Sequence, residues 1–115
     1  MIRFVLSGGR IPAAHLLPLV RHFAARGWEH AIHAGPLDEL EPADGDAFVA
    51  CDTGLDRALR GRPERVFRIQ LQHNLTGLKG SDFGRSRAEL HLLAGRRILE
   101  SCGADPADPR YRIRG

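Results

Sequence analysis

The chain has 115 residues, of which 43% are hydrophobic and 27% are charged, the composition of an ordinary globular protein with one domain. Its net charge of +3 comes from scattered arginines, and aromatic residues make up 6%, so we expect no nucleic-acid partner. No apolar run is long enough to span a membrane, and Gly8, Gly9 and Arg10 interrupt the first run too early for a signal peptide. Cys51 and Cys102 lie far apart without a C-x-x-C pair, which predicts reduced thiols and a cytoplasmic location.

Four short apolar runs, each ended by glycine or by a polar residue, predict β-strands in the first two thirds of the chain. They are residues 2–6, 29–34, 47–51 and 65–72. Between the first two runs, apolar residues recur at helical spacing over residues 12–27, and Gly27 is a suitable helix stop. Pro18 lies inside this segment, which predicts a kink or a late start of the helix.

The connections between these runs carry fewer signals. The acidic segment 38–46 predicts a surface turn or a short helix, and a second short helix is expected to follow Gly54 and to reach Leu59. The polar segment 73–87 contains several glycines and is long for a loop inside a compact domain. Loops of that length are usually functional or mobile.

The last third of the chain admits two interpretations. One is a strand over residues 89–94, a helix over 96–101 and a final strand over 111–114. The other replaces the first two elements with one continuous helix over 87–101. Short apolar runs do not separate these alternatives by periodicity alone.

Strands that alternate with helices predict an α/β fold: a Rossmann-like, doubly wound, mostly parallel sheet of about five to six strands in one domain. We expect the first strand, residues 2–6, at the centre of this sheet and helices on both of its faces. In such sheets ligands bind at the carboxyl ends of the strands. The residues expected there are Gly8, Gly9, Arg10, Gly35, Asp52, Thr53, His73 and Asn74.

The segment Ser7-Gly8-Gly9-Arg10 joins a predicted strand to a predicted helix. Backbone N–H groups of glycines can approach a phosphate closely, and the start of a helix favours an anion. The segment lacks the full G-x-G-x-x-G pattern, so it is not a dinucleotide-binding fingerprint. A tight turn that needs positive φ at glycine is the alternative interpretation.

Four other side chains after predicted strands are candidates for chemistry. His73 could take a proton from a hydroxyl nucleophile, and Asn74 could orient either that histidine or a substrate. Lys79 is the chain's one lysine, and its compact ammonium suits a phosphate. Asp52 could position a ligand. The alternatives are a surface histidine, a solvated loop lysine and an N-cap aspartate. The six histidines show no zinc-binding spacing, so no metal site is predicted.

Three stretches of the sequence resemble the N-terminal half of a GT-B enzyme that acts on nucleotide-linked donors. Residues 4–27, FVLSGGRIPAAHLLPLVRHFAARG, resemble its first strand, glycine turn and helix, and are similar to the start of non-hydrolysing UDP-N-acetylglucosamine 2-epimerases. Residues 68–80, RIQLQHNLTGLKG, resemble the strand and loop of CDP-glycerol glycerophosphotransferases and related polysaccharide transferases. Residues 104–115, ADPADPRYRIRG, resemble the last strand before the crossover to the second half.

The resemblance implies the acceptor-side domain of a glycosyl- or glycerophosphotransferase of cell-envelope polysaccharide synthesis. His73 would be its catalytic base. The residues implied to contact the substrate or its phosphates are Gly8, Gly9, Arg10, Asp52, Asn74 and Lys79. The whole chain, residues 1–115, would form this domain, and the nucleotide-binding half would be a second domain or subunit without which the chain is inactive.

The same resemblance sets the expected partners and leaves two other functions open. The partners would be a nucleotide-linked donor, a hydroxyl acceptor and the protein carrying the nucleotide site, and that protein could bring the chain to a membrane surface. No cofactor is implied. One alternative is a non-catalytic α/β binding or interaction module. The other is a fragment similar to UDP-N-acetylglucosamine 2-epimerases.

Overall fold

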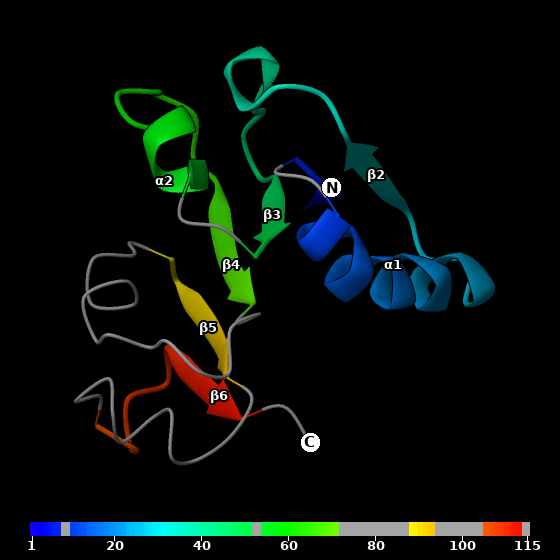
Figure 1. Cartoon of the computed structure of the whole chain (residues 1–115). Helices are drawn as coiled ribbons and strands as arrows, with labels where there is room; N and C mark the ends of the chain where they lie inside the picture. Colours follow the sequence, from blue (N-terminus) through cyan, green and yellow to red (C-terminus); the bar gives the residue numbers. More distant parts are fainter. Residues whose placement is uncertain (8–9, 52–53, 72–87, 94–104, 114–115) are drawn as a thin grey trace.

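The computed structural model describes residues 1–7, 10–51, 54–71, 88–93 and 105–113. Six parallel strands form one sheet in the order β2-β1-β3-β4-β5-β6 (Figure 1). The described elements are β1 (Ile2–Val5), α1 (Arg10–Ala25), β2 (His30–His33), η1 (Leu37–Glu39), β3 (Ala47–Ala50), α2 (Gly54–Ala58), β4 (Phe67–Leu71), β5 (Leu90–Leu93) and β6 (Tyr111–Ile113). The predicted α/β class and the parallel, wound sheet are therefore confirmed. No helix in the described ranges is long and apolar enough to cross a membrane.

Two expectations about the sheet are corrected by this topology. The continuous helix over residues 87–101 is wrong, because Leu90–Leu93 is a strand paired in parallel with β4. The first strand is not at the centre of the sheet, because β2 alone lies on one side of it. Every later strand adds on the other side, so β3 and β4 occupy the middle. The helix predicted over residues 96–101 lies outside the described residues.

The middle strands are covered on both faces, and the alternation of side chains along each strand supplies both layers. Phe4 faces α1, and its neighbour Val5 faces the opposite side. The buried residues of the α1 layer are Phe4, Leu16, Val20, Val49, Cys51 and Leu71. Those of the opposite layer, which includes α2, are Val5, Leu40, Phe48, Ala50, Leu55 and Leu59. A parallel sheet needs this double cover, because its strands expose apolar side chains on both faces.

A buried carboxylate, that of Asp46, links the amino ends of β1 and β3. Asp46, 6% exposed, accepts hydrogen bonds from the Arg3 guanidinium at 3.1 Å and from the Ala43 N–H at 2.9 Å. The N-terminal amine lies 3.5 Å from the same carboxylate. Burial alone would raise the pKa of Asp46, but these hydrogen bonds and charges lower it below its usual value. The cluster therefore keeps its charge while it ties β1 to the turn before β3.

Helix α1 runs without interruption from Arg10 to Ala25, earlier than the late start that Pro18 suggested. Proline cannot donate the hydrogen bond that the carbonyl of Ala14 would otherwise accept. Ala14 and Pro18 are both exposed, so water can reach that carbonyl. The buried face of the helix, Leu16 and Val20, is undisturbed.

The end of α1 is a Schellman motif. The Trp28 N–H donates to the Phe23 carbonyl at 2.9 Å, and the Gly27 N–H donates to the Ala24 carbonyl at 3.1 Å. Gly27 has a φ of 66°, in the left-handed region. The rings of Phe23 and Trp28 meet edge to face, with centroids 5.1 Å apart. This cap directs the chain into β2.

The cap gives the first testable prediction. Gly27→Ala should lower the free energy of unfolding by about 1 kcal/mol, because alanine strains at positive φ. An added Cβ would meet nothing within 4 Å, so the loss comes from the backbone and not from a clash. Urea denaturation measures the change. The control is Ala25→Gly, which should cost a similar amount through helix propensity instead. Unchanged stability in Gly27→Ala would contradict the cap.

Candidate functional site

The strand order reverses between β1 and β3. The chain leaves β1 through α1 and adds β2 on one side, whereas it leaves β3 through α2 and adds β4 on the other. The carboxyl ends of β1 and β3 are neighbours. The connection after β1 leads to β2 on one side of this pair, and the connection after β3 leads to β4 on the other side. In open α/β sheets this divergence opens the crevice in which ligands bind. The candidate site is therefore the sheet edge at the ends of β1 and β3.

Backbone and side-chain hydrogen bonds fasten the residues after β1 to those after β2. The Leu6 N–H donates to the His33 carbonyl at 2.8 Å, and the Ser7 hydroxyl donates to the Gly35 carbonyl. The His33 Nε2 donates to the Pro36 carbonyl at 2.8 Å. The segment that leaves β1 at Ser7 is thus bonded to the segment that leaves β2, beside the candidate site.

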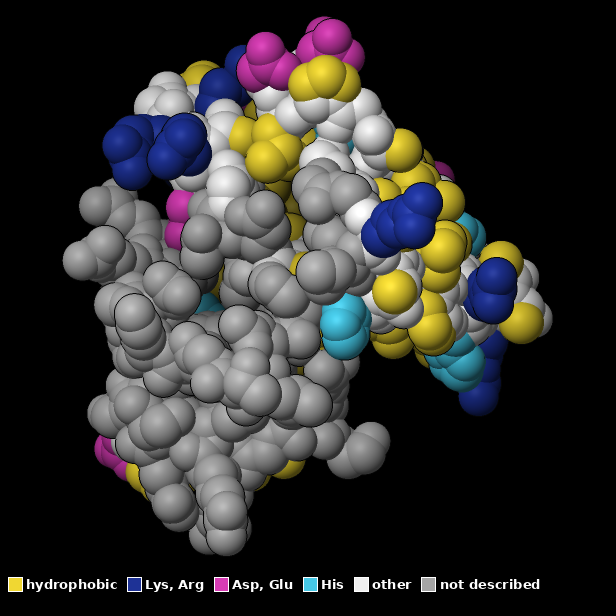
Figure 2. All heavy atoms as spheres, viewed as in Figure 1, with side chains coloured by type: hydrophobic (Ala, Val, Ile, Leu, Met, Phe, Trp, Pro, Cys, Tyr) yellow, Lys and Arg dark blue, Asp and Glu magenta, His cyan; other side chains and the backbone are white. Residues whose placement is uncertain are grey.

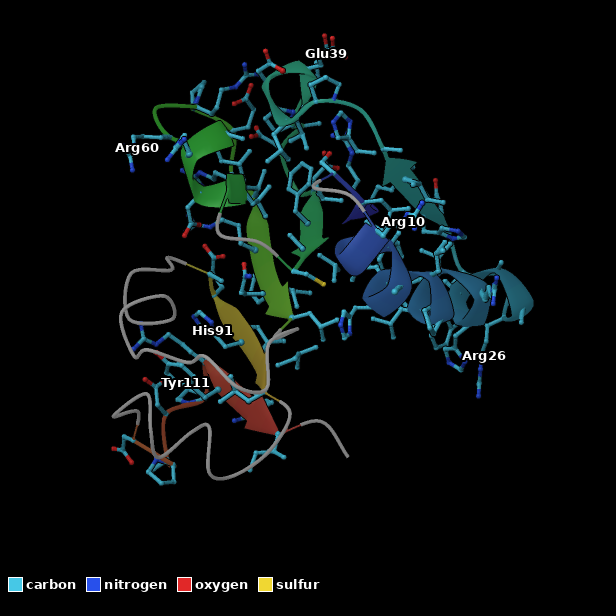
Figure 3. All side chains as sticks on the ribbon, in the orientation of Figure 1. Arg10, Arg26, Glu39, Arg60, His91 and Tyr111 are labelled. Carbon is cyan, nitrogen blue, oxygen red and sulfur yellow. The ribbon has the colours of Figure 1, made fainter. Side chains whose placement is uncertain are left out.

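Arg10 is the one predicted site residue with a charge that the structure describes. It is the first residue of α1, and its side chain is exposed (Figure 3). The first turn of α1 holds no acidic side chain, and no described acid forms an ion pair with Arg10. The start of a helix carries unsatisfied N–H groups and a partial positive charge. An anion at this position would face both the helix end and the guanidinium.

The other predicted site residues divide into two groups. Gly35 is described: it lies after β2 and accepts the Ser7 hydroxyl, as the predicted position at a strand end requires. The remaining residues, Gly8, Gly9, Asp52, Thr53, His73, Asn74 and Lys79, lie outside the described residues. The sheet does bring together the strand ends that precede them in sequence, because β1, β3 and β4 are adjacent and parallel. The roles of these side chains stay predictions.

A polar cluster that the sequence reasoning missed lies on the α2 face of β4 and β5. The Arg68 guanidinium donates to both carboxylate oxygens of Glu89, at 2.9 and 3.2 Å, and lies 3.5 Å from Asp56 of α2. Burial alone would raise the pKa of Glu89, but the hydrogen bonds from Arg68 lower it. These partners satisfy one another, so we assign the cluster to holding β5 and α2 against β4. The alternation of RVFRIQLQ could have revealed it, since Arg68 and Gln70 share a face.

His91 continues this face onto β5 and β6. It is 1% exposed and stacks on Tyr111, with ring centroids 4.9 Å apart and planes 13° apart. Burial, together with the nearby charge of Arg110, lowers the pKa of His91 below its usual value. Figure 3 shows His91 and Tyr111 on neighbouring strands, away from Arg10. We therefore place His91 in the packing of the sheet and not in the candidate site.

The lowered pKa of His91 predicts acid sensitivity. Below about pH 6.5, where an ordinary histidine gains its proton, the unfolded chain binds more protons than the folded one, so stability falls as the pH falls. His91→Phe keeps a ring against Tyr111 but cannot titrate. Its melting temperature should therefore change less than that of the parent chain between about pH 7.5 and pH 5.5. Exposed His22→Phe is the control. Equal acid sensitivity in parent and His91→Phe would contradict the assignment.

Neither a metal site nor a known relative identifies the chain further. Within the described residues, no three His, Cys, Asp or Glu side chains gather in a group that could hold a metal ion. No family model, curated protein or solved structure matches the chain at a significant level. The structure thus defines the class, a single wound parallel α/β sheet with a candidate site at its switch point.

Proposed function

We propose that this chain is the acceptor-side half of a glycosyl- or glycerophosphotransferase that uses a nucleotide-linked donor. Its site would be the sheet edge at the ends of β1 and β3. The observation that carries the proposal is the reversal of strand order between these two strands, since such a reversal is where wound α/β sheets bind phosphorylated ligands. The exposed Arg10 at the start of α1 adds positive charge at that edge.

The resemblance described above supplies the chemistry of the proposal. RIQLQHNLTGLKG begins in β4, and its His73 and Lys79 follow in the sequence after that strand ends at Leu71. SGGR follows the end of β1 in the same way. The epimerase-like motif SGGR and the transferase-like motif RIQLQHNLTGLKG therefore follow strands that end at one edge, the arrangement a shared site requires.

In the proposed reaction His73 accepts the proton of the acceptor hydroxyl as its oxygen attacks the donor. A bond forms from that oxygen to the sugar carbon or to the phosphorus of the glycerophosphate. The bond from that atom to the leaving nucleotide breaks, and the nucleotide departs with the electron pair. Lys79, Arg10 and the N–H groups of Gly8 and Gly9 would stabilise the charge on the donor phosphates.

A screen of donors tests this function directly. The melting temperature of the chain is measured with CDP-glycerol, UDP-linked sugars and inorganic pyrophosphate, first alone and then with a candidate nucleotide-binding half added. The proposal expects a shift with at least one donor and turnover only with both halves present. A chain that responds to no donor, alone or combined, would favour the non-catalytic interaction module instead.

His73→Ala in the combined enzyme should lower turnover by about 10²–10⁴-fold, because a positioned base contributes that much to the rate. Donor affinity and melting temperature should change little. Initial rates at saturating donor and acceptor measure the effect. His22→Ala, an exposed histidine on α1, serves as the control and should keep full turnover. Full turnover in His73→Ala would remove the proposed base.

Lys79→Ala should weaken binding of the donor diphosphate, and the loss should shrink as added salt screens the charge. Isothermal titration at low and at high salt measures both effects. The matched control is Arg60→Ala, which removes one positive charge from an exposed position that lies well apart from Arg10 in Figure 3. A loss of affinity that is equal in both variants would show that net charge matters and that Lys79 does not contact the phosphates.

A further inference from the structure

The outer edge of β2 pairs with no described strand and is not part of the proposed site. β2 is the last strand on its side of the sheet, so one row of its backbone groups has no strand partner among the described residues (Figure 1). An edge of this kind is a template for pairing with another chain. Natural proteins usually protect such edges with charge, bulges or a covering segment, and no described element covers this one.

The direction of each backbone group on β2 follows from its bonds to β1. The His33 carbonyl accepts the Leu6 N–H at 2.8 Å, so the backbone polar groups of His33 point toward β1. Successive residues of a strand alternate in this direction. Ala31 therefore also points toward β1, and the N–H and C=O groups of His30 and Ile32 point outward.

The side chains around this edge combine apolar surface with one carboxylate and one imidazole. Trp28 and Ile32 are 47% and 48% exposed, and they are among the largest exposed apolar side chains of the described residues. Figure 2 shows hydrophobic side chains gathered at the right of the view, over α1, which packs beside β2. Glu29, just before the strand, is exposed, and His33 closes the strand. One short segment thus carries an acidic and a basic side chain four positions apart.

We propose that the outer edge of β2 pairs with β2 of a second copy of this chain, antiparallel, around a twofold axis at Ala31. In an antiparallel pair, residues that exchange both hydrogen bonds must both point outward. A twofold axis at Ala31 places outward His30 opposite outward Ile32 of the second copy, and the reverse. An axis between Ala31 and Ile32 would place outward groups opposite inward ones and is excluded.

The positions of Glu29 and His33 select among the registers that the backbone allows. With the axis at Ala31, Glu29 of each copy lies opposite His33 of the other, and both hydrogen-bonded pairs lie inside β2. With the axis at Ile32, the hydrogen-bonded pairs extend to Ala34, and with the axis at His30 they extend to Trp28. Both residues lie outside the strand. In both registers Glu29 no longer lies opposite His33. This self-complementarity identifies the occupant as a second copy, because a twofold interface presents the same patch from both sides.

Sedimentation velocity of the full chain over a range of concentrations tests the dimer. The parent chain should dimerise as its concentration rises. Ile32→Pro removes one outward N–H but no bond to β1, so it should sediment as a monomer with an unchanged circular-dichroism spectrum. A parent chain that stays monomeric at the highest concentration, or a folded Ile32→Pro chain that still dimerises, would overturn the proposal.

Charge reversal tests the register by rescue. Glu29→Lys should weaken the dimer about tenfold or less, the range of a single exposed pair. Adding His33→Glu to it should restore the dimer, because each new lysine then lies opposite a new glutamate of the other copy. That substitution also removes the His33–Pro36 hydrogen bond, so the circular-dichroism spectrum of the double variant must match that of the parent. Glu41→Lys, at an exposed position before β3, changes net charge equally and should leave the dimer as in the parent. Equal weakening by Glu29→Lys and Glu41→Lys would overturn the Glu29–His33 pairing.

Cross-linking gives a readout that does not depend on the strength of the dimer. Opposed residues of a non-hydrogen-bonded pair have Cα atoms about 4.5 Å apart, within the range of a disulfide. Ala31→Cys should therefore form an intermolecular disulfide under mild oxidation, faster than Ile32→Cys, whose two copies are offset along the strands. The parent chain, with Cys51 and Cys102, gives the background. Faster cross-linking of Ile32→Cys would overturn the register.

Discussion

The covering of the middle strands on both faces is the constraint on which the rest of the structure depends. A parallel sheet cannot turn one face to water when its strands are apolar on both sides, so each connection must return across a face and bring cover with it. Leu16 and Val20 of α1 cover one side, and Leu55 and Leu59 cover the other. The alternation of Phe4 and Val5 in a four-residue strand is enough to require both layers.

The two layers also place the candidate site. Because α1 and α2 cover opposite faces of the sheet, the neighbouring ends of β1 and β3 lie between the two helix layers. The Schellman motif at Gly27 and the hydrogen bonds of Leu6 and Ser7 hold β2 beside the end of β1. These described contacts therefore hold the strands after which the residues of the resemblance follow in the sequence.

The polar groups with the most described contacts join elements of the sheet and lie away from the candidate site. Asp46 joins the amino end of β1 to the turn before β3, and Arg68 joins β4 to Glu89 and Asp56. Both Asp46 and Arg68 have an opposite charge and a hydrogen bond, as the cost of burial requires. Arg10 differs, because it stands at the start of α1 without a described acidic partner.

The amino-acid pattern by itself determined the elements in most of the described chain. The apolar runs of β1, β3 and β4, the helical spacing around Leu16 and the stop at Gly27 depend on local geometry, which the sequence carries directly. It did not separate a strand from a helix at Leu90–Leu93, because a short apolar run suits both. Only pairing with β4 decided that element. The order of strands, the off-centre position of β1, the pairing of Arg68 with Glu89 and the outward edge of β2 join residues far apart in the chain. No local pattern records such pairings, because they follow from how the crossovers add strands to the sheet and from which faces remain to be covered.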